Sequence, residues 1–197
     1  YSGIAQAITD FQDANPEYKY TALNEFGEHL SLETDSVDYL ISHEVMEHVQ
    51  NTESVTAEMY RVVKPGGQVF IATCNYDSFF DAHYRMFLPP IKSKWFRKLW
   101  VRLHGFNTKF VNEINFITKN KLRSLLLEAG FKDVTFYQDL DWKPSQVNLQ
   151  VNYPKGFEFK EFKVRDVPFQ RFIQKPSITK FLSKFNREYK MYVSAIK

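Results

Sequence analysis

"MYRVVKPGGQVFIATCN", residues 59–75, contains a helix-to-strand junction that decides the fold. The apolar positions leading into it recur at helical spacing and predict one buried face: Val55, Met59, Val62 and Val63. Pro65 cannot continue that helix, and the glycines Gly66 and Gly67 permit the backbone to reverse. The run "QVFIAT", 68–73, is then typical of a buried strand. Such a junction indicates α/β architecture.

Patterns of the same two kinds alternate on both sides of the junction. Apolar or alternating runs predict further strands at 18–24, 37–42, 133–138 and 189–196. Apolar spacing and capping residues, among them Asn51 or Thr52, Thr118 and Ser177, predict helices at 2–14, 53–63, 118–129 and 177–185. Because apolar strands alternate with helices, we expect a doubly wound α/β domain with a mostly parallel sheet covered on both faces.

Composition limits the other possibilities. A length of 197 residues with 44% hydrophobic residues fits a single domain, residues 1–197. The 26 basic and 23 acidic residues leave a net charge of only +3, so charge gives no reason to expect a nucleic-acid partner. The single cysteine, Cys74, excludes an internal disulfide framework and a cysteine-based zinc site, and it favours a reducing, cytoplasmic setting. No apolar run is long enough to span a bilayer.

Two segments break the alternation of helices and strands. Residues 75–115 are rich in aromatic and basic side chains around Pro89 and Pro90, which is typical of an insertion or a lid. Residues 139–187 have a weak pattern, and we interpret them as a region that caps the substrate site or contacts a partner.

Four motifs together resemble the second half of the class I S-adenosylmethionine-dependent methyltransferases. They occur in the order of that family: "LETDSVDYLISHEVMEHV", "AEMYRVVKPGG", "QVFIATCN" and "NFITKNKLRSLLLEAGFKDV". The resemblance implies a Rossmann-like fold with an antiparallel final strand, S-adenosyl-L-methionine as cofactor, and a site beyond the carboxyl ends of the strands. In the insertion the chain is also similar to ubiquinone-biosynthesis O-methyltransferases, which implies O-methylation of a small or lipid-linked acceptor.

Two features of that family are absent from the sequence. By the family's layout, its glycine-rich loop and the acidic residue that holds the ribose would both precede Tyr1. We therefore expect a domain that is incomplete at its N-terminus, with a degenerate family member as the alternative.

The resemblance implies cofactor contacts after two of the strands. Glu25 matches the family's acidic residue at the adenine amino group, with Phe26 beside the ring, and Ser42 and His43 follow the next strand. A solvated acid at Glu25 and a core phenylalanine at Phe26 are the alternative.

Proton-accepting side chains gather after the strand at 37–42, in "SHEVMEH". His43 and His48 are the candidate catalytic bases, because imidazole titrates near neutral pH. They are five residues apart and so do not share a helix face, which excludes the H-E-x-x-H zinc pattern, and we expect no metal. A hydrogen-bonded structural histidine at His48 is the alternative. His83 and His104, in the insertion, are weaker candidate bases. The residues expected to face the substrate are Glu44, Tyr76, His83, Tyr84 and Trp95.

Two roles are consistent with the sequence of segment 91–103. As a helix it would place its aromatic and aliphatic side chains on one half and Lys94, Arg97, Lys98 and Arg102 largely on the other. That pattern suits a peripheral contact with a membrane, and equally a lid that packs its aromatic residues over a pocket.

Three functions therefore remain to be weighed. A methyltransferase is the leading hypothesis, and a non-catalytic binding module of the same ancestry, which holds a partner or a membrane, is the second. A nicotinamide-dependent oxidoreductase is disfavoured, because the spacing of the motifs does not resemble those enzymes. The oligomeric state stays open.

Overall fold

The computed structural model describes residues 23–91, 93–137 and 175–197, together with residues 13, 16, 21 and 172. The chain divides into two compact units, and the one formed by Phe26–Trp142 and Val167–Lys197 contains all the helices and strands with described bounds. The other unit, Tyr1–Glu25 and Lys143–Asp166, has few described residues. The helix expected at 2–14 and most of the strand expected at 18–24 lie outside the described residues.

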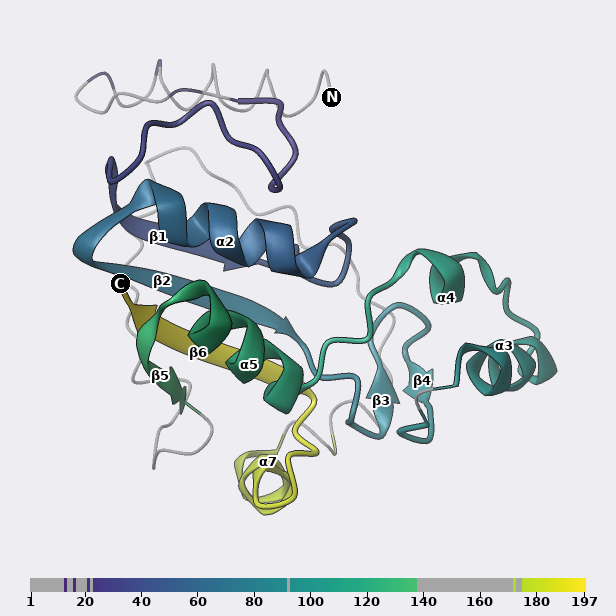
Figure 1. Ribbon diagram of the computed structural model, residues 1–197. Helices are drawn as coiled ribbons and strands as arrows, with labels where there is room; N and C mark the ends of the chain where they lie inside the picture. Colours follow the sequence, from purple (N-terminus) through teal and green to yellow (C-terminus); the bar gives the residue numbers. More distant parts are fainter. Residues whose placement is uncertain are drawn as a thin grey trace. The chain divides into compact units, whose positions relative to one another are not determined.

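A four-stranded sheet forms the centre of the described unit (Figure 1), in the order β1-β2-β6-β5. Its strands are β1 (Val37–His43), β2 (Val63–Cys74), β5 (Lys132–Phe136) and β6 (Lys190–Ile196). β1 pairs with β2 in parallel, and β6 pairs antiparallel to both β2 and β5. Three strands thus share one direction and only the last runs against them, which confirms the expected α/β class with an antiparallel final strand.

Two helices, α2 (Thr52–Val62) and α5 (Lys119–Ala129), pack side by side over one face of this sheet (Figure 1). Their apolar faces and the inward side chains of the strands form one buried cluster, which includes Val55, Met59, Leu122, Leu125, Leu126, Val69, Ile71 and Val193. The helical spacing in the sequence identified the members from both helices, and burial of this apolar surface is the main stabilising contribution of the unit.

The caps that limit these helices also match the sequence. The Asn51 side chain accepts a hydrogen bond from the Ser54 amide at 2.9 Å, and Thr118 accepts one from the Lys121 amide at 3.3 Å. Gly130 ends α5 with φ of 108°, a left-handed conformation that glycine adopts without steric cost. The third expected cap was wrong, because α7 (Pro176–Ser183) begins ahead of Ser177, with proline in its first turn.

At the helix-to-strand junction before Pro65, the helix ends earlier than expected. α2 stops at Val62, and β2 already begins at Val63, so Pro65 does not terminate the helix. The register moves from Val37 opposite Val63 to Tyr39 opposite Gln68, which leaves the Lys-Pro-Gly-Gly segment as a bulge within β2. The residue before a proline favours extended backbone, and here that residue is Lys64, which already belongs to β2.

The insertion at 75–115 contains a hairpin and two helices, which lie together beside the sheet in Figure 1. The hairpin pairs β3 (Phe80–Asp81) with β4 (Met86–Phe87), and the helices are α3 (Lys94–Leu103) and α4 (Lys109–Glu113). α3 does not bury the apolar face that a lid over a pocket would require. It buries Arg97 and Val101 and leaves the apolar residues Trp95, Leu99 and Leu103 exposed. The guanidinium can be buried because main-chain carbonyls and aromatic rings surround it.

Candidate functional site

The carboxyl ends of β1 and β2 meet at one edge of the sheet. Ser42 lies opposite Ile71 and His43 opposite Ala72, which confirms that these segments are adjacent parallel strands. β6 runs in the opposite direction, so its first residue, Lys190, pairs with Cys74 and joins the same edge. In open α/β sheets ligands bind at this edge, and the side chains gathered here form the candidate site.

The loop that follows β1 is held against this edge by main-chain hydrogen bonds. Glu44 adopts a positive φ of 55° and donates its amide to Ala72 at 2.8 Å. The Asn115 amide donates to the carbonyl of Glu47 at 2.8 Å, and the Asn115 side chain donates to the carbonyl of Val49. A positive φ is uncommon for a non-glycine residue, and these hydrogen bonds hold the loop in that conformation. The chain therefore turns sharply at Glu44, which brings Glu44 and Glu47 back to the strand ends.

The two carboxylates of this loop contact β2 and β6. The Thr73 hydroxyl donates to Oε2 of the fully buried Glu47 at 2.8 Å, and the Lys190 ammonium lies 2.9 Å from Glu44 Oε1. Burial alone would raise the pKa of Glu44, but the hydrogen bond and charge of Lys190 lower it overall. Burial and the two neighbouring carboxylates raise the pKa of the Cys74 thiol, which stays protonated and donates to Glu44 at 3.5 Å.

Within the part of the chain that the structure describes, Glu44, Glu47 and Cys74 place possible metal-ligand atoms within 4.8 Å of one another. Lys190 already neutralises Glu44, Thr73 occupies one oxygen of Glu47, and the thiol keeps its proton. A cation would have to displace these partners, so we assign no metal to the cluster.

Two buried oxygen atoms at this edge have no hydrogen-bond partner among the described residues. They are Ser42 Oγ, near the end of β1, and Glu47 Oε1. Buried polar atoms are nearly always paired in native structures, because an unpaired one costs about 1–3 kcal/mol. Both atoms can therefore bind hydroxyl or amino groups of a ligand at the strand ends.

Two histidines from distant parts of the sequence meet beside these carboxylates. Nε2 of His48, in the loop after β1, lies 3.2 Å from Nε2 of His83, in the β3–β4 hairpin. The Tyr76 hydroxyl lies 3.1 Å from Nδ1 of His83. Burial lowers the pKa of His83, against the raising effect of nearby carboxylates, so this imidazole is neutral at pH 7. The pair is suited to proton transfer at the edge of the site.

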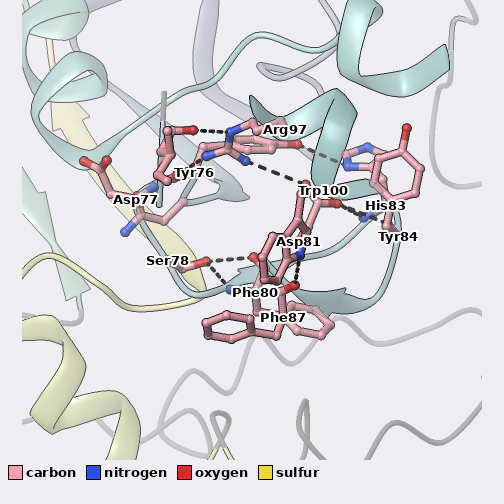
Figure 2. A network of polar contacts seen from close by, with 12 residues as sticks. Tyr76, Asp77, Ser78, Phe80, Asp81, His83, Tyr84, Phe87, Arg97 and Trp100 are labelled. Atoms are coloured by element: carbon pink, nitrogen blue, oxygen red, sulfur yellow. Dashed lines mark hydrogen bonds and ion pairs between the residues drawn. The ribbon is translucent and has the colours of Figure 1, made fainter. Parts of the chain in front are cut away.

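The buried guanidinium of Arg97, in the insertion, holds the hairpin that carries His83 (Figure 2). Arg97 of α3 donates to the carbonyl of Tyr76 at 2.8 Å and to that of Ile91 at 2.7 Å, and its Nη1 lies 4.0 Å from Asp81 Oδ2. Asp81 Oδ1 in turn accepts the amides of His83 and Tyr84 at 3.0 and 3.1 Å. The hairpin that carries His83 is thereby connected to α3 through one guanidinium.

The remaining residues expected in the site are less close to one another. His43 is exposed at the end of β1, Phe26 is exposed to 73%, and Glu25 belongs to the other unit of the chain. Tyr84 is buried against the rings of Phe106 and Phe110. Trp95 is exposed on α3, and His104 caps the end of that helix, where its ring bonds the carbonyl of Trp100.

Sequence reasoning missed three residues of this region. Glu47 stands inside the motif "SHEVMEH", where its spacing from Glu44 could have identified it. Asp81 and Arg97 had no such signal, because their roles depend on how the insertion folds back on itself.

Comparison with known proteins yields a family and several relatives. The methyltransferase domain family matches residues 4–71. A ubiquinone biosynthesis O-methyltransferase of Pseudomonas fluorescens strain Pf0-1 is 31% identical over 147 residues, which cover 68% of this chain and 61% of that protein. An uncharacterized protein of Methanocaldococcus jannaschii is 26% identical over 134 residues, 66% of this chain and 57% of that one. The chain thus spans less than two thirds of the length of either relative.

Solved structures resemble the chain at lower identity. One is the crystal structure of an S-adenosylmethionine dependent methyltransferase from Mesorhizobium loti, which is 14% identical in sequence. The match covers 94% of this chain and 73% of that one, with a TM-score of 0.49.

Proposed function

Because this chain belongs to the class I S-adenosylmethionine-dependent methyltransferases, we propose that the protein transfers a methyl group from S-adenosyl-L-methionine to an oxygen atom of a small-molecule or lipid-linked acceptor. The single observation that carries the proposal is the set of polar groups at the carboxyl edge of β1 and β2. The unpaired Ser42 Oγ and Glu47 Oε1 lie there, together with the His48–His83 pair.

These groups fit the cofactor and its chemistry. Ser42 Oγ can bind a hydroxyl or amino group of the cofactor, and the exposed ring of Phe26 can stack on a base. When bound, S-adenosyl-L-methionine supplies a methyl group on a sulfonium that is already electrophilic. The protein's part is then to align the acceptor and to remove its proton.

The imidazole pair and the name of one relative support an oxygen acceptor. A hydroxyl must lose a proton on methylation, and His48 and His83 can accept one. The Pseudomonas fluorescens relative is named for O-methylation in ubiquinone biosynthesis, which supports a phenolic hydroxyl here. The buried free thiol of Cys74 supports a reducing, cytoplasmic setting.

Titration calorimetry with S-adenosylhomocysteine tests the cofactor assignment. We expect micromolar binding to the protein and about tenfold weaker binding to Ser42→Ala, because one hydrogen bond is worth about 1.4 kcal/mol or less. Ser194→Ala, which removes a hydroxyl in the middle of β6, is the matched control and should bind normally. Absence of binding to the unaltered protein would support the non-catalytic binding module instead.

The exposed face of α3 favours an additional role at a membrane surface. Trp95, Leu99 and Leu103 recur every four residues and are exposed to 71%, 41% and 72%. Basic residues flank this stripe: Lys94, Lys98 and Arg102. A short helix with an apolar stripe and basic flanks binds in the plane of an anionic membrane surface. The orientation also argues against a lid that packs Trp95 over the site.

None of the helices among the described residues is both long enough and apolar enough to cross a bilayer. The membrane role that we propose for α3 is a peripheral one, which would bring a lipid-linked acceptor close to the insertion.

Co-sedimentation with vesicles of phosphatidylcholine and phosphatidylglycerol tests this role. We expect the unaltered protein to pellet with them, and the double variant Trp95→Ser/Leu103→Ser to remain in the supernatant. Leu127→Ser, which removes an exposed leucine from α5, should pellet normally. If the unaltered protein does not pellet, the membrane role is wrong and the methyltransferase proposal is unaffected.

A further inference from the structure

The hydrogen-bond direction between Tyr76 and His83 can be assigned from burial. The Tyr76 side chain is buried, and its hydroxyl bonds His83 Nδ1 at 3.1 Å. Burial, followed by the charge of Asp81, raises the pKa of Tyr76, so the phenol keeps its proton. A buried hydroxyl that did not donate would leave its hydrogen unpaired at a cost of about 1–3 kcal/mol. Tyr76 therefore donates, and His83 Nδ1 accepts.

This assignment fixes the protons on both imidazoles. A neutral histidine carries one N–H, so His83, with Nδ1 as acceptor, carries its hydrogen on Nε2. His83 Nε2 faces His48 Nε2 at 3.2 Å, and His48 Nε2 must then accept. His48 thus carries its own hydrogen on Nδ1. The two histidines have opposite tautomers, and they present one donor and one acceptor to each other.

From this pair, and resting on the proposed function, we propose that His83 Nε2–H and His48 Nε2 together bind the hydroxyl of the methyl acceptor, with His48 as the catalytic base and Tyr76 as the residue that positions His83. The hydroxyl enters between the two nitrogen atoms. Its oxygen accepts from His83 while its hydrogen is donated to His48. Hydrogen bonds of about 2.8 Å to one oxygen require the nitrogens to move apart, which the exposed His48 side chain permits.

The transfer step balances with these groups. One lone pair of the acceptor oxygen accepts the hydrogen bond from His83, and the other forms the bond to the methyl carbon. The bond between the methyl carbon and sulfur breaks, and its electron pair stays on sulfur. The hydroxyl proton passes to His48 Nε2. The positive charge therefore moves from sulfur to the imidazolium of His48, which belongs to the same loop as Glu44 and Glu47.

The same geometry discriminates between acceptor classes. A hydroxyl oxygen has two lone pairs and one hydrogen, which match one donor, one acceptor and one attack on the methyl group. A neutral amine has a single lone pair, and donation from His83 would occupy the pair that must attack. An ammonium has no lone pair, and a carboxylate has no hydrogen for His48. Of these four groups, only the hydroxyl is complementary to the pair.

The groups around His83 hold this orientation. Tyr76 fixes the ring, and Asp81 fixes the main chain by accepting the His83 amide. Both are in contact with Arg97, which donates to the Tyr76 carbonyl and lies beside the Asp81 carboxylate. Glu44 and Glu47 also raise the pKa of His83, and His48 lowers it.

Long-range ¹H–¹⁵N NMR spectra of histidine side chains at pH 7.5 test the tautomers directly and need no substrate. We expect His83 with its hydrogen on Nε2 and His48 with its hydrogen on Nδ1. In Tyr76→Phe, which keeps the ring but loses the donor, we expect both tautomers at each histidine. Tyr84→Phe is the matched control, because its hydroxyl lies in the same hairpin and does not bond His83. It should leave both signals unchanged.

Three outcomes separate this inference from the proposed function. Identical tautomers on both histidines, or a Tyr76→Phe spectrum identical to that of the unaltered protein, overturn the inference while cofactor binding is unaffected. If S-adenosylhomocysteine does not bind, the methyl-transfer step falls together with the proposed function. Addition of catechol to the protein saturated with S-adenosylhomocysteine should shift the Nε2 signals of both histidines, whereas aniline should not.

The last test measures the rate of methyl transfer, with labelled S-adenosyl-L-methionine as methyl donor and catechol as acceptor. His48→Gln keeps an acceptor atom but cannot take a proton, and it should lower the rate about 100-fold or more. Tyr76→Phe should lower the rate less and change its pH profile, a readout that a merely structural role would not move. A His48→Gln rate within about twofold of the unaltered protein overturns the assignment of His48 as base.

Discussion

At the scale of single residues, Gly67 lies where β2 has no room for a side chain beside β1. A Cβ atom there would lie 2.8 Å from the Asp38 carbonyl and 3.0 Å from that of Lys64. Both are backbone atoms, so neither can turn away as a flexible side chain would. We expect Gly67→Ala to lower the free energy of unfolding by about 1–3 kcal/mol, because it forces the bulge away from β1. Urea denaturation measures the change.

Gly27→Ala provides the control for that prediction. Its Cβ would meet the Val55 methyl groups at 3.5 and 3.6 Å, which is ordinary van der Waals contact. Its unfolding free energy should stay within about 0.5 kcal/mol of that of the unaltered protein. Equal stability of the two alanine variants would contradict the steric argument.

What the sequence could predict at this scale was local. Asn51, Thr118 and Gly130 act on amides and carbonyls within a few residues of themselves, so their roles follow from the sequence alone. The contact between His48 and His83 depends on the path of the insertion, and spacing along the chain has no information about it. Each histidine was a candidate, but their pairing was not predictable.

At the scale of elements, α2 is fixed to the preceding loop by one carboxylate. Glu58 accepts the Leu30 amide at 2.8 Å and bonds Arg61 through both of its oxygens. The Arg61 hydrogen bond is the main reason that the pKa of Glu58 falls to about 2. A folded-state pKa below the usual value of 4.5 means that the stabilisation is complete above pH 4.5. It is then lost as the pH falls toward about 2.

We therefore expect Glu58→Gln to lose about 1.5–3 kcal/mol of unfolding free energy at pH 7, the range for hydrogen bonds to charged groups. The difference from the unaltered protein should shrink between pH 4.5 and 2. Urea denaturation across that range measures it.

Glu53→Gln is the comparison, since the pKa of Glu53 is also lowered to about 2, chiefly by Lys121. Glu53 and Lys121 are about half exposed, so water and salt screen their attraction. This variant should lose at most about 1 kcal/mol. A larger loss for Glu53→Gln than for Glu58→Gln would contradict the argument that burial strengthens the Glu58 contacts.

The helices and strands of the sheet were predictable because their periodicity reflects burial against a core. The orientation of α3 was not predictable, because the sequence has an apolar and a basic face and the structure buries Arg97 from the basic one. A basic residue on a predicted helix normally faces solvent. The burial of Arg97 is favourable because its guanidinium meets the carbonyls of Tyr76 and Ile91, an aromatic ring and the Asp81 carboxylate. The polar contacts that decide this orientation come from another part of the chain.

At the scale of the whole unit, one buried ion pair connects α5 to β6. Lys119, in the first turn of α5, lies 3.1 Å from Glu188, two residues before β6, and both side chains are almost fully buried. The Lys119 ammonium also lies over the Phe136 ring of β5 at 5.3 Å. The pair thus joins a helix to two strands that are distant in sequence, and no periodic pattern in the sequence signals it.

Removing one member of this pair should destabilise the unit more than removing both. Lys119→Met removes the Lys119 ammonium from the buried Glu188 carboxylate, and we expect a loss of about 3–5 kcal/mol in the free energy of unfolding. The double variant Lys119→Met/Glu188→Met replaces both charges with apolar side chains of similar volume, and it should recover most of that loss. Urea denaturation measures these two variants and the single variant Glu188→Met, provided that the m-value is unchanged. If the double variant is as unstable as the two single losses added together, the charges do not act as a pair, and the packing of α5 on β6 depends on each of them separately.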